Sequence, residues 1–226
     1  MVSILPLLLF ISSLAAEAQQ PRSFLYGGFA MNQFSGDLQA DYNAYTGSFL
    51  VGVQLNRSKR LNGSFGISYG KISSENSEYR FSPDPTASPN RFFSSSLFTI
   101  QYELHVNMLK KENYILYLSQ GIGLARYKPE DDLGNSLLNR YTTRAPNETY
   151  GNSSIMLPSR LGFMYLLPNA WGLGLEAGYL NTLTDYLDNI GQWGNRKGND
   201  NVLQFSFKVY APLKRPTATV TAKNSP

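Results

Sequence analysis

The feature that most constrains the fold of this chain is residues 164–184, which read MYLLPNAWGLGLEAGYLNTLT. After a short turn at 167–170, side-chain character alternates from one residue to the next. One parity is mostly large and apolar, and the other is small or polar: Trp171, Leu173, Leu175, Ala177, Tyr179 and Leu183 against Gly172, Gly174, Glu176, Gly178 and Thr182. Successive side chains of a strand point to opposite faces, so the pattern predicts a strand with one apolar face. Its length of about a dozen residues suits a transmembrane strand, which needs about 9–11 residues.

The same alternation recurs along the chain and predicts eight strands, at 24–34, 46–56, 61–72, 92–109, 114–127, 154–167, 171–183 and 201–210. The connections alternate in length. Longer polar connections cover 37–45, 73–91, 128–152 and 184–200, and short ones cover 57–60, 110–113 and 168–170. An even number of strands joined in this way is typical of outer-membrane barrels, with short periplasmic turns and longer extracellular loops. We therefore predict an all-β fold, an eight-stranded antiparallel transmembrane β-barrel with both ends in the periplasm.

Composition agrees with a membrane β-barrel. Mean hydropathy is only −0.27, yet 13% of the residues are aromatic and 19 are glycine. No segment beyond the N-terminus has the 18 or more apolar residues of a transmembrane helix. The chain has no cysteine, which excludes disulfides and thiolate metal sites. The net charge of +4 is scattered, without the basic stripe that would indicate nucleic-acid binding.

The N-terminus predicts a secretory signal peptide. Residues 4–14 form an apolar core, and Ala16-Glu17-Ala18 fits a small-x-small cleavage site, although no Lys or Arg precedes the core. The alternative is a buried strand or helix of the fold. We expect a signal peptide at 1–18, the barrel at 19–213 and a flexible periplasmic tail at 214–226, rich in Pro, Thr and Lys. Export without cysteines places the protein in the bacterial cell outer membrane.

The two parities also predict which face of the wall meets lipid. In the fourth segment, for example, the apolar side chains of one parity oppose the polar side chains of the other: Phe98, Ile100, Tyr102 and Leu104 against Thr99, Gln101, Glu103 and His105. The polar parity suits a narrow, polar lumen, and the apolar parity suits hydrocarbon. A soluble sandwich or lipocalin-like barrel, with the apolar parity inward, is the alternative. The first segment does not separate into two clean faces.

The polar parity turns Glu103, Arg160, Glu176 and Lys208 into the lumen, and all four lie at a similar distance from the periplasmic ends of their strands. We therefore expect these four to meet at one level of the lumen, with Gln54, Gln101 and His105 nearby. An eight-stranded barrel is just wide enough to be filled by its own side chains. Two acids and two bases at one level would neutralise each other, whereas unpaired charges there would be costly. The sequence leaves two hypotheses open, a structural ion-pair plug and a gated pathway for small solutes.

The sequence favours a non-enzymatic protein without cofactors. Barrel enzymes use histidine with a carboxylate or serine as base and nucleophile. The single histidine, His105, shares its face with Glu103, but no well-placed serine accompanies them. Asp131 and Asp132 in the third long connection are the one candidate for calcium, with simple solvated acids as the alternative. We predict no catalytic residue, cofactor or metal.

Several motifs resemble a known family. They are Leu175-Glu176-Ala177-Gly178-Tyr179, the loop Thr184-Asp185-Tyr186-Leu187-Asp188-Asn189, Phe34-Ser35-Gly36-Asp37-Leu38, and Leu157-Pro158-Ser159-Arg160-Leu161-Gly162. Together, over 24–213, they resemble the Bacteroidetes outer-membrane barrels of the DUF6089 type, a family that includes the type IX secretion component PorG. The loop Thr184, Asp185, Tyr186, Leu187 and Asp188 is the most specific of these motifs. The chain departs from the family in having Asp188-Asn189-Ile190-Gly191 where Asp-Asp-Val-Ser is frequent.

The resemblance implies a membrane-anchored structural component, of the type IX protein secretion system or a relative, that holds a periplasmic ring of protein or lipoprotein subunits. Besides outer-membrane lipid, we expect such partners at basic residues of the short turns and tail: Arg57, Lys59, Arg60, Lys110, Lys111, Lys214 and Arg215. Two alternatives stay open. One is a channel for small or hydrophobic solutes, similar to the OmpW-like barrels, and the other is an adhesin that uses the long loops.

Overall fold

A computed structural model describes residues 20–78, 80, 90–138, 148, 151–194 and 198–213 of the chain. The predicted signal peptide at 1–18 and tail at 214–226 lie outside these residues, and so do Lys214 and Arg215. Among the residues described, no helix is long and apolar enough to cross a membrane.

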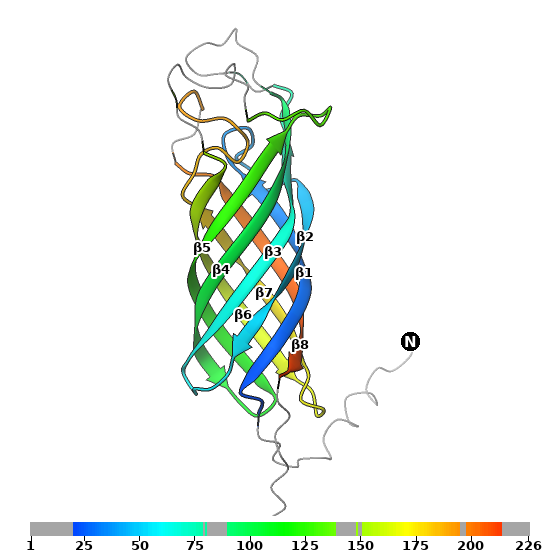
Figure 1. Cartoon of the computed structure of the whole chain (residues 1–226), viewed down its shortest axis with the longest axis vertical. Coiled ribbons are helices and arrows are strands. Elements are labelled where there is room, and N and C mark those ends of the chain that lie inside the picture. Colours follow the sequence, from blue (N-terminus) through cyan, green and yellow to red (C-terminus); the bar gives the residue numbers. More distant parts are fainter. Residues whose placement is uncertain are drawn as a thin grey trace, which may run out of the picture.

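The described chain is a closed barrel of eight antiparallel strands in sequence order (Figure 1). The strands are β1 (Ser23–Ser35), β2 (Tyr45–Leu55), β3 (Leu61–Glu75), β4 (Phe92–Lys110), β5 (Tyr114–Glu130), β6 (Ser153–Leu166), β7 (Gly172–Thr182) and β8 (Asn201–Pro212). The predicted fold class is confirmed. The largest differences from the predicted bounds are at β3 and β5, which each run three residues further, to Glu75 and Glu130.

The barrel closes where the two ends of the chain meet. β8 pairs with β1 from Phe24↔Pro212 to Ser35↔Asn201. The three short turns lie at one end of the barrel, together with the start of β1 and the end of β8, and the longer connections lie at the other end (Figure 1). We call these the short-turn end and the long-loop end. Closure leaves no edge strand, so the wall satisfies its own backbone hydrogen bonds, as hydrocarbon requires.

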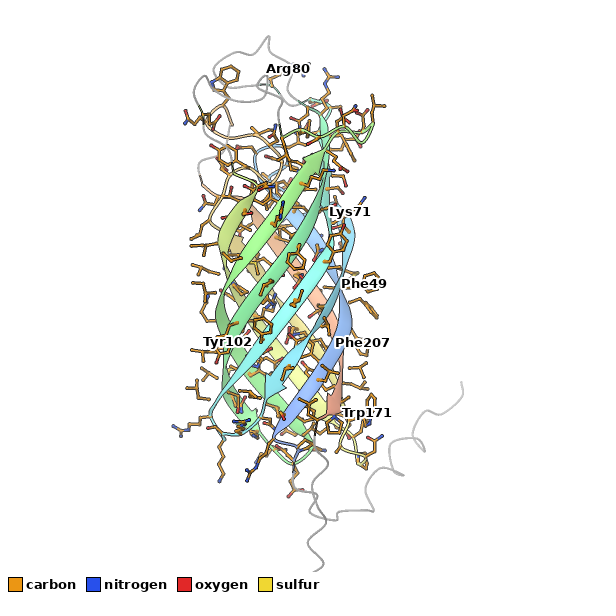
Figure 2. All side chains as sticks on the ribbon, in the orientation of Figure 1. Phe49, Lys71, Arg80, Tyr102, Trp171 and Phe207 are labelled. Atoms are coloured by element: carbon orange, nitrogen blue, oxygen red, sulfur yellow. The ribbon has the colours of Figure 1, made fainter. Side chains whose placement is uncertain are left out.

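The apolar parity points outward. Phe49, Leu124 and Leu175 are 77%, 62% and 60% exposed, and Phe49, Tyr102 and Phe207 project away from the wall (Figure 2). Trp171 lies near the short-turn end (Figure 2) and is partly exposed, as are Tyr69 and Tyr179. Such an apolar exterior would be insoluble in water and suits a membrane. The soluble barrel with an apolar lumen and polar exterior is therefore the wrong alternative.

The prediction of a polar lumen is correct only for the middle of the barrel. At the short-turn end the lumen is filled by buried apolar and aromatic side chains: Phe24, Tyr26, Ile115, Tyr117, Met164, Leu166 and Tyr210. A second, larger cluster fills the long-loop end: Phe34, Leu38, Ile72, Phe93, Leu97, Ala125, Tyr127, Leu137, Met156, Leu180, Leu187, Ile190 and Val202. The interior is thus built in three layers, with polar groups between two apolar cores.

These layers explain why the first strand has no clean faces in the sequence. Phe24, Tyr26 and Phe34 point inward and are at most 3% exposed, because they belong to the two apolar layers. Phe29 and Met31 point outward and are more than half exposed. Both parities of β1 therefore carry large apolar residues, one set for the core and one for the exterior.

Candidate functional site

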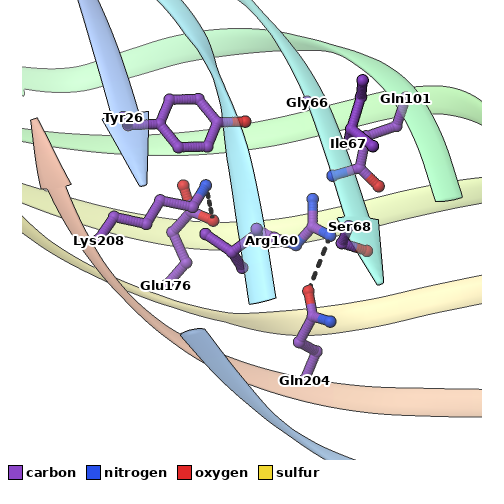
Figure 3. Close-up of a pocket in the computed structure, with 10 residues that line it drawn as sticks. Tyr26, Gly66, Ile67, Ser68, Gln101, Arg160, Glu176, Gln204 and Lys208 are labelled. Atoms are coloured by element: carbon purple, nitrogen blue, oxygen red, sulfur yellow. Dashed lines mark hydrogen bonds and ion pairs between the residues drawn. The ribbon is translucent and has the colours of Figure 1, made fainter. Parts of the chain in front are cut away.

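The four charged residues of the predicted lumenal cluster meet in the middle of the barrel. Glu103 lies on β4, Arg160 on β6, Glu176 on β7 and Lys208 on β8, and each is at most 5% exposed. Arg160 Nη1 donates to Glu103 Oε1, and Lys208 Nζ lies 2.5 Å from Glu176 Oε2. We call these four residues the charged layer. Figure 3 shows Lys208 beside Glu176 and Arg160 directed toward Gln204.

Further side chains satisfy the two carboxylates. Glu103 accepts hydrogen bonds from Gln101 Nε2 at 2.8 Å and from Ser119 Oγ at 2.8 Å. Glu176 accepts one from the Tyr117 hydroxyl at 2.5 Å. Hydrogen bonds to charged groups are roughly twice as strong as neutral ones, so this network strengthens the ion pairs.

Arg160 extends the network across the lumen. Its Nη2 donates to Gln204 Oε1 at 3.0 Å, and Gln204 Nε2 donates to Asn32 Oδ1 at 2.9 Å. Asn32, Tyr117, Ser119 and Gln204 are members of the site that the sequence pattern did not single out. Ser119 and Gln204 share the inward parity of their strands, so alternation could have indicated them. Ser119 is also the cross-strand partner of His105 and bonds Glu103, so the expectation that no serine lies near these two residues is wrong.

An inward glycine makes room for the aromatic member of the network. Gly162 on β6 is the cross-strand partner of Tyr117 on β5, and the ring lies against the glycine so closely that a Cβ would overlap it. The ring can therefore cross the lumen and place its hydroxyl on Glu176. His105 stacks against the same ring, with centroids 4.4 Å apart and planes at 8°.

Gln54 and His105 lie in the lumen but stand apart from the hydrogen bonds of the charged layer. Gln54 is 3% exposed, and its Oε1 lacks a hydrogen-bond partner within the described part of the chain. The same holds for His105 Nδ1, which is buried against Tyr117. Neither residue contacts one of the charges in the way that Gln101 contacts Glu103.

Little space is left at the level of the charged layer. The cavity between these side chains has a volume of about 10 Å³ and is lined by Tyr26, Leu50, Gly66, Ile67, Ser68, Gln101, Arg160, Glu176, Gln204 and Lys208 (Figure 3). A cavity of roughly 10–15 Å³ holds about one water molecule. The Lys208 ammonium also lies 4.5 Å from the centre of the Tyr26 ring, which closes the layer toward the short-turn end.

At the long-loop end, two connections fold into the mouth and join there. The Asp188 carboxylate accepts the backbone N–H of Leu38 at 3.0 Å and of Ile190 at 2.9 Å. Asp200 accepts the N–H of Leu187 at 2.8 Å. We call Leu38 and the segment 184–194, with Asp200, the loop plug. The segment that resembles the family signature is thus buried, with Leu187, Asp188 and Ile190 all fully covered.

The carboxyl groups of the loop plug are in an unfavourable setting for charge. Burial raises the pKa of Asp188 to about 8 against the pull of its two N–H donors, and Asp37 and Asp185 nearby act in the same direction as burial. Burial also raises the pKa of Asp200 well above its usual range, followed by repulsion from Asp188 and Asp185. Oδ1 of Asp200 lacks a donor among the described residues. The plug therefore holds protons that an exposed aspartate would release.

The calcium hypothesis finds no support in the part of the chain that is described. Asp131 caps its own turn, because its oxygens accept the N–H groups of Leu133 at 3.0 Å and Asn135 at 2.7 Å. The described residues contain no group of three or more acidic, histidine or cysteine side chains that could hold a metal ion.

The predicted partner contacts lie at the short-turn end. Arg57, Lys59, Arg60 and Lys111 are exposed, whereas Lys110 is half-buried and donates to Asn56 Oδ1 at 2.5 Å. The structure thus brings these residues to one end of the barrel, while Lys214 and Arg215 lie outside the described residues.

Comparison with known proteins adds only the fold. No family model matches the chain, and no curated protein matches it. Among solved structures it is similar to Ail of Yersinia pestis, solved alone and with the heparin analogue sucrose octasulfate. The identity is 13%, the coverage 85% of this chain and 98% of Ail, and the TM-score 0.49. Neisserial surface protein A is 17% identical, with coverage of 84% of this chain and 96% of that protein and a TM-score of 0.48. OprG of Pseudomonas aeruginosa is 11% identical, with coverage of 86% of this chain and 96% of OprG and a TM-score of 0.41. At these identities the likeness concerns the barrel fold alone.

Proposed function

We propose that this chain is a non-enzymatic outer-membrane barrel that acts as a membrane-anchored structural and interaction component rather than as a channel. The observation that carries the proposal is the filled lumen. Two apolar cores and the charged layer between them leave a cavity of about 10 Å³ at mid-height. A solute would have to displace packed side chains in at least three successive layers.

The energetics of the charged layer support a closed lumen. Separating either ion pair would leave a buried charge without its partner, which costs several kcal/mol in a low-dielectric interior. The network of Gln101, Ser119 and Tyr117 would lose hydrogen bonds in the same step. A gate would need a competing partner for each of these groups as the pairs separate.

The orientation of the proposal follows from the loops. In outer-membrane barrels the short turns face the periplasm and the long loops face outward. The short-turn end would then present its basic residues to the periplasm, and the loop plug would face the outside. The resemblance to the family of the DUF6089 type supports a more specific role, attachment of a periplasmic ring of the type IX secretion system.

The proposal is tested by recovery of partners and by conductance. The tagged chain is crosslinked in cells, extracted from the outer membrane in mild detergent, and its companions are identified by mass spectrometry. We expect stoichiometric periplasmic protein or lipoprotein subunits. The same purified barrel in planar bilayers should carry no single-channel current. Recovery of the barrel alone would overturn the proposal, and conductance that changes in Glu103→Gln would favour a solute channel in its place.

A further inference from the structure

Charge is distributed unevenly around the short-turn end. Six cations lie just before β1 and on or beside the first two turns: Arg22, Arg57, Lys59, Arg60, Lys110 and Lys111. The one acid in these described segments is Glu112. The third turn, 167–171, and the described end of β8 carry no charged side chain. Because the strands follow one another around the barrel, the cations occupy one contiguous half of this end.

The basic half is a connected structure. Gln20 Nε2 donates to the carbonyl oxygens of Lys111 at 2.5 Å and Glu112 at 2.8 Å, so the segment before β1 reaches the β4–β5 turn. Asn56 of the β2–β3 turn bonds the same segment, through its Nδ2 to Pro21 O at 3.0 Å and its N–H to Arg22 O at 2.8 Å. Residues 20–22, 56–60 and 110–112 thus form one unit, which we call the basic platform.

Hydrogen bonds fix the first two turns to each other as well. Asn107 donates from its N–H to Arg60 O at 2.8 Å and from Nδ2 to Lys59 O at 3.0 Å. Lys110 Nζ donates to Ser58 O at 3.0 Å. The backbone under the exposed cations is therefore held in place, which lowers the entropy lost when a partner binds.

The cations of the platform have no ion-pair partner in the part of the chain that the structure describes. Arg57, Lys59, Arg60 and Lys111 are exposed, and a single acid, Glu112, lies beside them. Clustered like charges repel one another, so an opposite charge from outside the chain would be favourable here.

We propose that the basic platform is the docking site for an acidic surface of a periplasmic protein, bound on one side of the barrel axis. This rests on the proposed function and names the chemistry of the partner that function requires. The surface supplies Asp and Glu carboxylates to Arg57, Lys59, Arg60 and Lys111. Arginine binds carboxylates through two parallel hydrogen bonds and thus adds geometric specificity to the charge.

The geometry favours a protein over the anionic head groups of the surrounding lipid. Lipid surrounds the whole circumference, yet the third turn, 167–171, which includes Trp171, carries no cation of its own. Gln20, in the segment before β1, also bonds the β4–β5 turn, although neither β4 nor β5 is a neighbour of β1 in the barrel. A one-sided basic surface fits one partner in one orientation.

The test is carbodiimide crosslinking in native outer membranes, which joins a lysine amine to a carboxylate that it contacts. We expect Lys59 or Lys111 to be joined to Asp or Glu side chains of one periplasmic protein. In the variant Arg57→Glu/Lys59→Glu/Arg60→Glu, recovery of that protein should fall about tenfold or more, because like charges now face each other. The variant Lys59→Arg/Lys111→Arg should retain the protein but lose the crosslink.

The matched control is Pro168→Glu/Asn169→Asp, which adds two negative charges to the uncharged third turn and keeps the side-chain oxygen that accepts Trp171 N–H. It should recover the partner as the wild type does. If the wild type recovers a partner that the triple reversal also retains, the platform inference is wrong and the proposed function stands. If the wild type recovers none, the proposed function itself fails. If the triple reversal retains the partner but loses binding to vesicles that contain anionic lipid, the platform binds lipid instead.

Discussion

The barrel contains two buried sets of ionisable groups that differ in how their charge is balanced. In the charged layer, Glu103 and Glu176 each face a cation and accept at least one further hydrogen bond. In the loop plug, Asp188 and Asp200 lie near other carboxyl groups, and within the described ranges their side-chain oxygens accept backbone N–H groups. The first set is held together by opposite charges, whereas burial and neighbouring carboxyl groups favour the protonated form of the second.

The difference in charge balance follows from where the two sets lie, one on strands and the other on connections. The charged layer is built on four strands, each of which pairs without a break with at least one neighbouring strand, so the position of each side chain is fixed. The loop plug is built on connections, whose backbone groups need partners that no neighbouring strand supplies, and buried carboxyl oxygens supply them. Strand positions here pair opposite charges, whereas loop positions hold carboxyl groups whose pKa is raised by burial.

The largest expected effect comes from breaking one pair of the charged layer. Arg160→Met leaves Glu103 buried beside Gln101 and Ser119 without its cation. We expect the free energy of unfolding to fall by about 3–5 kcal/mol, the cost of orphaning one partner of a buried pair. Urea unfolding of the detergent-solubilised barrel, followed by the shift in electrophoretic mobility between folded and unfolded forms, measures it.

The matched variant is Glu103→Leu/Arg160→Met, which removes both charges. Replacing a whole buried pair by apolar residues is often neutral or stabilising. The double variant should therefore be much closer to the wild type than Arg160→Met alone. Equal losses in the two variants would mean that packing at position 160, and not the charge of Glu103, dominates.

Much of the charged layer is predictable from the sequence because two simple rules determine it. Alternation gives the face, and distance from a short turn gives the height, so both rules together place Glu103, Arg160, Glu176 and Lys208 at one level. Their hydrogen-bond partners do not follow from these rules. Tyr117 and Glu176 are 59 residues apart, and an aromatic residue on the polar parity reads as an exception unless the lumen is known to be filled.

The loop plug was beyond the sequence rules for a different reason. Residues 184–194 have no periodicity, so spacing predicts neither the direction of their side chains nor their depth in the barrel. The contact of Asp188 with Leu38 joins positions 150 residues apart. The apolar residues that point into the lumen at the strand ends were not predicted, because the side chains still alternate between the two faces there. Only the inner face changes, from polar to apolar.

A smaller effect compares two tyrosines on β5. Tyr117 bonds Glu176 of the charged layer, and the Tyr127 hydroxyl lies 3.0 Å from Thr184 Oγ1 of the loop plug. The Tyr117 hydroxyl donates to the Glu176 carboxylate at 2.5 Å, and the Tyr127 hydroxyl donates to the neutral Gly151 carbonyl at 2.6 Å. Tyr117→Phe should cost about 1.5–3 kcal/mol of stability, as for a hydrogen bond to a charged group, and Tyr127→Phe about 0.5–1.5 kcal/mol for each neutral hydrogen bond that is lost. The same urea titrations compare them. A larger loss in Tyr127→Phe would refute the ranking of the two sets.

The smallest effect is confined to the loop plug and depends on pH. An ordinary aspartate has a pKa near 3.8, and the pKa of Asp188 in the closed plug is about 8. Between these values the closed plug holds a proton that an opened loop releases, so raising the pH favours opening. The closed form should be most stable at or below about pH 4, lose stability up to about pH 8 and change little above it.

Trp193, which packs against the long-loop core, reports on this opening. The chain has two tryptophans, so Trp171→Phe leaves Trp193 as the single fluorophore. Quenching of its fluorescence by acrylamide should increase from pH 5 to pH 8. Adding Asp200→Asn removes one titrating group and keeps an oxygen for Leu187 N–H, so the increase should shrink. Asp132→Asn, at an exposed loop acid, should leave it unchanged. An undiminished increase in Asp200→Asn would show that the proton is held elsewhere in the plug.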